Sequence, residues 1–185
     1  MSKLQFSSLK HHEPGVVSSL LRRSYQELVE AFPEHWSPEQ ATWDDFDRTA
    51  FDCPDTVGAC TFVTCLGGEP VGLGSFNPTK GPGTGEVGHN CILPGFRKRG
   101  FGKRQLDEIV RRLRGRKAER ILATTSEHPF FLPAREMYLS FGFKETGRRE
   151  GGPDPGFRLV DYELEVTGNG AASELDDYEE LCDED

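Results

Sequence analysis

The sequence predicts a single-domain α/β (α+β) fold in which helices flank a central β-sheet. Apolar residues alternate with polar ones in some segments and recur at helical spacing in others. These segments follow the order β-α-α-β-β-β-α-β-α-β-β without an internal repeat. The chain has 185 residues, which is close to the usual size of one domain. We therefore expect one folded unit over residues 1–166 and a C-terminal tail.

The N-terminal half is expected to hold a strand, two helices and a hairpin. Apolar residues after Pro14 follow helical spacing up to Phe32. A second helix is expected to begin with Ser37 as N-cap and Gln40 closing a capping box. Gly67-Gly68 predicts a tight turn between two strands. The expected strands span residues 4–9, 59–66 and 69–76.

The C-terminal half is expected to alternate strands and helices. Prolines and glycines predict a loop over residues 77–83. A helix is expected to open at Gly100 to Gly102, because Leu106, Ile109, Val110 and Leu113 form one apolar face. A second helix, with Ala134, Met137, Tyr138 and Phe141 inward, is expected to end at Gly142. The expected strands span residues 85–93, 120–125 and 157–166.

The net charge of −9 hides a strong segregation of charges. The tail, residues 167–185, is acidic and poor in apolar residues, so we expect it to be disordered. Residues 27–55 hold nine acids against Arg48 alone. Residues 95–120 instead hold eleven Lys or Arg against three acids. A basic patch in an acidic chain indicates a local anionic ligand rather than nucleic acid.

Several classes of protein are excluded by composition. No stretch approaches the roughly 18 apolar residues needed to span a bilayer, and no leader-like segment opens the chain. The five cysteines form an odd set without metal-binding spacing, so we expect reduced thiols and no metal site. These features favour a cytoplasmic protein without a membrane partner, and they leave open a homodimer.

The motif Arg97-x-x-Gly100-x-Gly102 lies between an expected strand and an expected helix. Glycines let backbone amides approach an anion, and the helix N-terminus adds partial positive charge. The segment lacks the Gly-Lys-Ser/Thr of a P-loop and the third glycine of a dinucleotide fingerprint. It therefore predicts a cradle for a pyrophosphate, the alternative being a structural turn on a basic surface.

This segment resembles motif A of the GNAT superfamily of N-acetyltransferases, Gln/Arg-x-x-Gly-x-Gly/Ala. The run from Ala134 to Phe143 is similar to the family's A-x-x-x-Y-x-x-x-G-F, and the resemblance spans roughly residues 4–166. It implies a GNAT fold, with a mixed, mostly antiparallel sheet of about seven strands flanked by about four helices. The chain departs from many relatives at Phe131, where they carry an asparagine.

The resemblance also implies a co-substrate, acetyl-CoA, and the residues that bind it without a metal. The backbone of the fourth strand is expected to pair with the pantetheine arm, and the following loop is expected to hold the pyrophosphate. The strand residues are Asn90, Cys91 and Ile92, and the loop residues are Arg97, Lys98, Arg99, Gly100, Phe101, Gly102 and Lys103.

Two catalytic residues are suggested by position in the family pattern. Glu86 lies where several lysine-acetylating relatives carry a general base, and Tyr138 lies where a general acid would protonate the departing thiolate. The alternatives are an exposed strand-start glutamate and a core tyrosine. His89 is expected on the face opposite Glu86 if the strand is regular, and a bulge would change that.

The acceptor is expected to be a primary, cationic amine, such as a polyamine, an amino sugar or a lysine or N-terminal amine. This hypothesis rests on the acids of residues 27–55, with Phe32, Trp36, Trp43 and Phe46 interleaved among them. A solvated acidic face is the alternative. Rival functions are a catalytically silent acyl-CoA-binding regulator and a protein-interaction module that works through its acidic tail.

Overall fold

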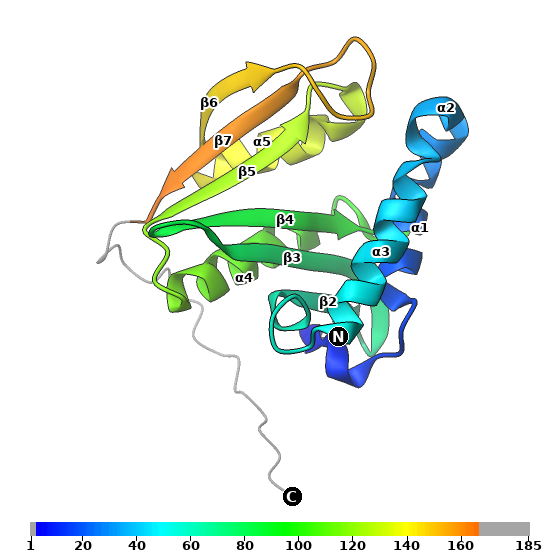
Figure 1. Ribbon diagram of the computed structural model, residues 1–185, viewed down its shortest axis with the longest axis vertical. Coiled ribbons are helices and arrows are strands. Elements are labelled where there is room, and N and C mark those ends of the chain that lie inside the picture. Colours follow the sequence, from blue (N-terminus) through cyan, green and yellow to red (C-terminus); the bar gives the residue numbers. More distant parts are fainter. Residues whose placement is uncertain (1–2, 167–185) are drawn as a thin grey trace, which may run out of the picture.

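The computed structural model describes residues 3–166, which fold on a seven-stranded sheet of order β1-β2-β3-β4-β5-β7-β6. All neighbouring strands are antiparallel except β4 and β5, which are parallel. The predicted mixed, mostly antiparallel sheet is confirmed (Figure 1). The strands are β1 (Leu4–Ser8), β2 (Thr61–Leu66), β3 (Glu69–Gly81), β4 (Thr84–Ile92), β5 (Arg120–Ser126), β6 (Lys144–Arg149) and β7 (Leu159–Glu165).

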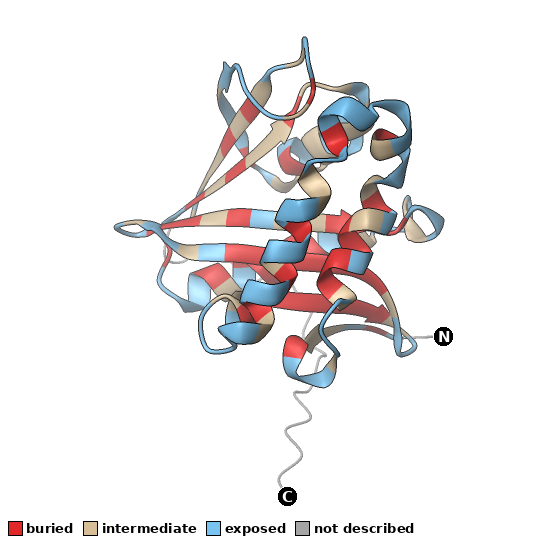
Figure 2. Ribbon diagram, turned by 45° about the vertical axis from the view of Figure 1, so that its right-hand side comes forward, coloured by how far each residue is buried: buried red, intermediate tan, exposed pale blue. Residues whose placement is uncertain are grey.

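Helices cover both faces of this sheet. Two long helices, α1 and α3, bury Leu20, Leu21 and Trp43 against one face. On the other face α4 and α5 pack on a second apolar cluster, which includes Phe62 and Ile121 (Figure 1). Figure 2 shows that buried residues follow the central strands and the inner helix surfaces. The helices are α1 (Val16–Ala31), α2 (Pro33–Trp36), α3 (Glu39–Asp52), α4 (Phe101–Gly115) and α5 (Leu132–Phe141).

The N-terminus of α1 is capped by an aspartate from α3. The buried Asp47 carboxylate accepts hydrogen bonds from the amides of Gly15, Val17 and Ser18 at 2.8, 2.9 and 3.2 Å. Amides in the first turn of a helix have no partner within the helix, so this carboxylate satisfies three of them. One of the nine acids between residues 27 and 55 therefore holds two helices together.

The predicted capping box at Ser37 is wrong. Ser37 has helical dihedral angles, with φ −62° and ψ −37°, and follows the single-turn helix α2. An N-cap serine needs an extended backbone, which this residue lacks. Pro38 takes the N-cap position of α3, and no side chain caps that helix.

The loop predicted over residues 77–83 is largely a continuation of β3. The hairpin with β4 reaches Gly81, which pairs with Thr84, so only the tip is a turn. Strand β2 begins at Thr61 opposite Ser75, and β3 beyond Phe76 therefore has a free edge on that side. Such an edge accepts Pro78, which cannot donate a ladder hydrogen bond.

Some predictions fall partly or wholly outside the described residues. The acidic tail, residues 167–185, lies outside them, and with it Cys182. Between residues 3 and 166 no helix is both long and apolar enough to cross a bilayer.

Candidate functional site

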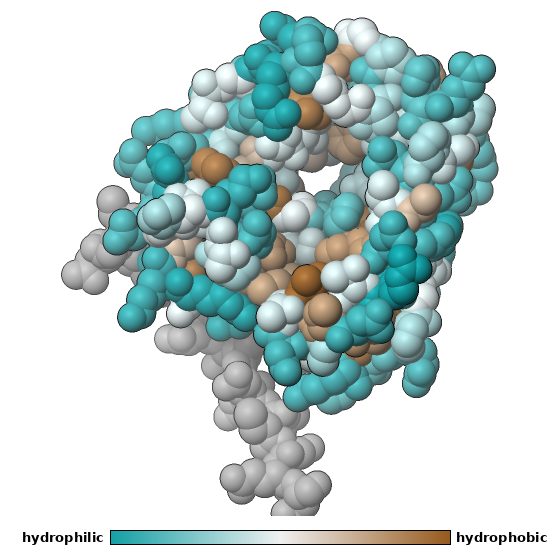
Figure 3. Space-filling view, viewed as in Figure 1, coloured by the Kyte–Doolittle hydropathy of each residue, from teal (hydrophilic) through white to brown (hydrophobic). Residues whose placement is uncertain are grey.

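Strands β4 and β5 separate after a short common stretch. They pair only from Thr84–Glu86 to Arg120–Leu122, and beyond Glu86 the two strands diverge (Figure 1). Figure 3 shows an opening through the molecule at this place, between the part built on β5 and the part built on β4. The edge of β4 that faces β5 therefore carries backbone groups without a strand partner over residues 87–92 in the described part of the chain.

Aromatic side chains connect α1 and α2 to the segment before α5. The Tyr25 ring of α1 lies 5.8 Å from that of Trp36, and the Trp36 ring stacks on Phe131 at 6.0 Å, both measured between centroids. The Trp36 indole also donates to the Asp154 carboxylate at 2.8 Å. Phe131, at the N-cap position of α5, thus joins that helix to the α1–α2 corner.

The loop from Arg97 to Lys103 ends at the N-terminus of α4. Gly100, at the N-cap position, has a left-handed φ of 79°, and no side chain caps the helix. Lys98 also has a positive φ, 60°, which is unusual for a residue with a side chain. The first-turn amides, including those of Phe101 and Gly102, therefore remain free of intrahelical partners at the positive end of the helix dipole. This geometry suits a bound anion.

The basic side chains of this loop differ in exposure and in their contacts. Lys98 and Lys103 are exposed beside the free amides. Arg99 is exposed too, and its guanidinium lies over the Phe96 ring at 5.4 Å. Arg97 instead turns inward, donating to the Ile92 carbonyl at 2.9 Å and to the Ser24 carbonyl at 2.6 Å. Arg97 therefore ties the end of β4 to α1.

A buried glutamine in α4 fixes the predicted pantetheine-binding strand. The Gln105 amide donates to the Asn90 side-chain oxygen at 2.6 Å and to the Leu73 carbonyl at 2.8 Å. Its own oxygen accepts from the Thr64 hydroxyl at 2.5 Å. Gln105 thus links β2, β3 and β4 from below. Sequence reasoning missed this residue, because a polar side chain on an amphipathic helix gives no sign of where it points.

Strand β4 contains a bulge at Gly88 and His89. Gly74 pairs with Asn90 and Phe76 with Val87, so β4 has one more residue than β3 in this interval. The Ser75 hydroxyl accepts the His89 amide at 2.7 Å, and a Cβ on Gly88 would lie 2.5 Å from that same oxygen. The Ser75 hydroxyl therefore stabilises the bulge through the His89 amide, and it leaves no room for a side chain at Gly88.

This bulge changes which residues share a face, so the arrangement expected for a regular strand, with His89 opposite Glu86, does not apply. Val87 packs in the cluster under α4, whereas Cys91 packs in the cluster under α1 and α3. In a regular strand these two residues would point to the same side. His89 lies on the α3 side, where its ring is 5.1 Å from that of Phe46. Glu86 precedes the bulge on that side and pairs with Lys80 at 3.0 Å.

Tyr138 lies in the core beneath the opening. It is buried, with its ring 5.3 Å from Phe143 and 5.5 Å from Tyr162. Burial raises the pKa of Tyr138 above its usual value, so the phenol keeps its proton. Tyr25 approaches from α1, and its pKa is raised by burial and further by Cys91 and Tyr138. Tyr25 is partly buried and brings a second hydroxyl near this place, and its position within an ordinary helical pattern hid it from sequence reasoning.

A cavity of about 750 Å³ lies next to the bulge, at the free edge of β3 beyond the start of β2, with Phe46 of α3 on one side and Arg116 at the end of α4 on the other. It is lined by Phe46, by parts of residues 55–61 and 75–79, by Gly88 and His89, and by Arg116. Figure 3 shows apolar residues on the side of the molecule that carries α3. Of the four aromatic residues predicted to border the acceptor, Phe46 alone is among those that line this cavity.

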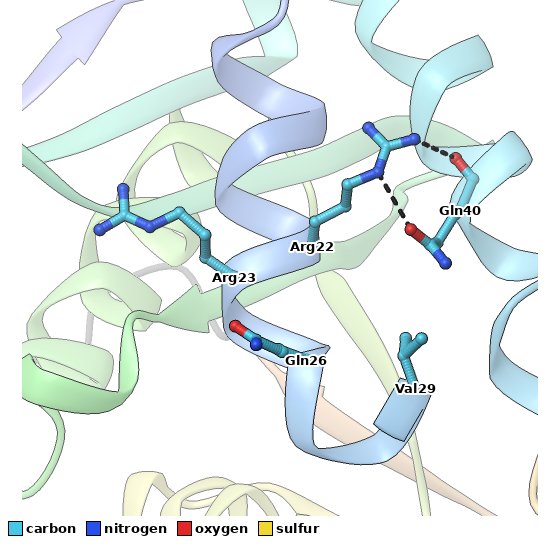
Figure 4. A pocket seen from close by; sticks show the side chains of 5 residues that line it. All are labelled: Arg22, Arg23, Gln26, Val29 and Gln40. Atoms are coloured by element: carbon cyan, nitrogen blue, oxygen red, sulfur yellow. Dashed lines mark hydrogen bonds between the residues drawn. The ribbon is translucent and has the colours of Figure 1, made fainter. Parts of the chain in front are cut away.

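A smaller hollow of about 150 Å³ lies at the seam between α1 and α3. Figure 4 shows Arg22 reaching across it to Gln40, while Arg23 extends to the other side of α1. Arg22 also forms an ion pair with Asp44 at 2.6 Å. These contacts hold the two helices together. Within residues 3–166, no three His, Cys, Asp or Glu side chains are grouped so as to hold a metal ion.

Comparison with known proteins gives one family. The sequence model of the acetyltransferase (GNAT) family matches residues 19–143, more than half of the chain. No curated protein matches the sequence.

Solved structures with the same fold have low sequence identity. A putative acetyltransferase of the GNAT family from Desulfovibrio desulfuricans is 19% identical, with a TM-score of 0.70 over 90% of this chain and 100% of that one. A putative acetyltransferase from Salmonella typhimurium, solved with acetyl-CoA, is 16% identical, with a TM-score of 0.67 over 92% and 96%. The ribosomal-protein-S18-alanine N-acetyltransferase from Escherichia coli is 16% identical, with a TM-score of 0.64 over 91% and 97%.

Proposed function

The chain belongs to the acetyltransferase (GNAT) family, and on that premise we propose that it is an acetyl-CoA-dependent N-acetyltransferase. The acetyl group passes directly to a primary amine while both substrates are bound. The observation that carries this proposal is the uncapped N-terminus of α4 beside the unpaired edge of β4. A pyrophosphate and the amide-bearing arm of one molecule would satisfy both sets of backbone groups.

In this proposal the loop binds acetyl-CoA mainly through its backbone. The amides from Lys98 to Lys103 surround the pyrophosphate, and the side chains of Lys98, Arg99 and Lys103 add positive charge. Asn90, Cys91 and Ile92 offer the backbone edge to the pantetheine arm. A β4 amide then polarises the thioester carbonyl as charge develops on its oxygen. Arg97 acts on the protein side, because its guanidinium is already bound to two carbonyls.

The proposed chemistry requires a neutral amine and a stabilised leaving group. An alkylamine with a pKa of about 10.4 is protonated at pH 7, so a proton must leave before attack. Glu86 is our proposed base, since it lies where β4 and β5 separate. Tyr138 is our proposed donor to the departing sulfur. Because burial raises its pKa, it stabilises the thiolate by a hydrogen bond more readily than by giving up its proton.

The positive charge of the acceptor has limited support. Of the nine acids that suggested it, Asp47 caps α1, Asp44 pairs with Arg22 and Asp45 pairs with Arg48. Of the nine, Asp55 is among the residues that line the large cavity. The proposal therefore keeps a primary amine as the acceptor. It does not require the acceptor to carry any charged group besides the amine that is acetylated.

The cofactor cradle is tested by a matched pair of substitutions at Gly102. A Cβ there meets no protein atom closer than the Met137 sulfur at 3.6 Å, so the fold accepts a methyl group. A larger side chain would crowd the backbone amides that we propose to bind the anion. We expect Gly102→Val to weaken acetyl-CoA binding by about tenfold or more, and Gly102→Ala by about threefold at most. Calorimetric titration measures both, with thermal melting to confirm folding. A folded Gly102→Val variant that binds as tightly as the wild type would refute the cradle.

The role of Tyr138 is tested by removing its hydroxyl. We expect Tyr138→Phe to lower kcat by about tenfold, the loss of roughly 1.4 kcal/mol of transition-state stabilisation, with acetyl-CoA affinity unchanged. Tyr162→Phe, which removes a neighbouring buried hydroxyl, is the control and should leave kcat unchanged. Thiol release with an amine in excess is the measurement. Equal rates in both variants would assign Tyr138 to packing, and no release from the wild type would favour a silent acyl-CoA binder.

The role of Glu86 is tested through the pH dependence of the rate. Without a base, only the amine already neutral in solution reacts, so Glu86→Gln should move the rising limb of the kcat/KM profile to higher pH. Lys80→Met removes the ion-pair partner and keeps the carboxylate, so it separates a chemical role from a structural one. We expect the limb to move in Glu86→Gln and to stay in Lys80→Met. Identical profiles in Glu86→Gln and the wild type would mean that deprotonation occurs through water.

A further inference from the structure

The cavity beside the β4 bulge has mainly apolar walls. Phe46 of α3, Val57 from the segment before β2, and Phe76 and Pro78 of β3 are among its lining residues. Its volume of about 750 Å³ lies within the range of small-molecule sites. Apolar walls of this size favour a ligand with an apolar, ring-sized body.

Charge at the cavity is sparse and balanced. Asp55 and Arg116 are its charged lining residues. The Arg116 guanidinium lies 4.9 Å from the centre of the Phe76 ring, so one wall carries a fixed cation. A second ammonium group on the ligand would be repelled by this guanidinium. It would also lose its hydration on entering the cavity, and Asp55 is the one carboxylate among the lining residues that could pair with it. The cavity therefore favours a monoamine over a polyamine.

His89 gives this cavity a polar group, and it directly precedes Asn90 in the strand proposed to bind the pantetheine arm. The Ser75 hydroxyl holds the His89 amide in the bulge, and the ring leans on Phe46. Within residues 3–166 no hydrogen bond is made by the ring nitrogens, and burial lowers the pKa of His89 to about 4. The imidazole is therefore neutral at pH 7 and has one nitrogen that accepts a hydrogen bond.

We propose that this cavity holds the acceptor, a primary monoamine on an apolar ring-bearing body, with the attacking nitrogen beside His89. The proposal rests on the acetyltransferase function proposed above. In the transfer, the amine nitrogen forms a bond to the carbonyl carbon and the carbon–sulfur bond breaks. The nitrogen loses one proton and the departing sulfur gains one, so the products are an amide and a free thiol. His89 orients the amine by accepting one N–H.

The experiment compares two probe amines and three forms of the full-length protein. The amines are 2-phenylethylamine and 1,4-diaminobutane, each titrated calorimetrically in the presence of coenzyme A and then assayed for thiol release with acetyl-CoA. Thr56→Trp fills the cavity from an exposed lining position, and Thr42→Trp puts the same side chain on the outer surface of α3 as a control. Circular dichroism confirms that each variant is folded.

The wild type and Thr42→Trp should bind 2-phenylethylamine more tightly than 1,4-diaminobutane. Thr56→Trp should weaken 2-phenylethylamine binding by about tenfold or more, with acetyl-CoA affinity unchanged. If Thr56→Trp does not fold, Phe46→Leu, which keeps an apolar wall without the ring, should weaken binding by about threefold or more.

The two proposals fail in different ways. Tighter binding of 1,4-diaminobutane, no binding of 2-phenylethylamine, or equal affinity in Thr56→Trp and Thr42→Trp would overturn the cavity assignment, whatever the enzyme turns over. Binding of 2-phenylethylamine that depends on the cavity, without thiol release from any amine, would uphold the site and overturn the acetyltransferase function.

Discussion

The hydrogen bond between the Ser75 hydroxyl and the His89 amide is the contact on which the rest of the site depends. It closes a bulge that adds one residue to β4 and reverses the faces of all residues after it. Asn90 thereby points to α4, where Gln105 binds it, and Cys91 points to α1. In a regular strand, the Asn90 side chain would face α1 and α3, and the His89 side chain would point away from the cavity.

Two further contacts hold the segment from Asn90 to Arg97 in place. Gln105 binds it from below, and Arg97 binds the Ile92 carbonyl and α1 from above. The unpaired edge of β4 and the start of α4 are therefore fixed relative to each other by side chains outside the proposed binding surface. Backbone donors held in place need little reorganisation when negative charge develops on the thioester oxygen. This lowers the barrier to acyl transfer.

The sequence predicted features that have a local cause. Gly67-Gly68 predicted the β2–β3 turn, and the apolar face of Leu106, Ile109 and Leu113 predicted α4 after its glycine loop. Features that depend on contacts with residues distant in the sequence could not be predicted from local patterns. Asp47 looked like one acid in a run, although it caps a helix thirty residues away, as its bond to Val17 shows. The bulge depends on a serine in the neighbouring strand, which no pattern within β4 reveals.

The central claim is that acetyl-CoA lies along the edge of β4 with its pyrophosphate at the start of α4. Amide NMR spectra of the isotope-labelled protein, recorded during a titration with acetyl-CoA, test this directly. The account predicts that the largest shifts fall on the amides of residues 98–103 and 90–92, with small ones on the far strands β1 and β6. Saturating acetyl-CoA that leaves these amides unmoved, or that shifts a different surface, would contradict it.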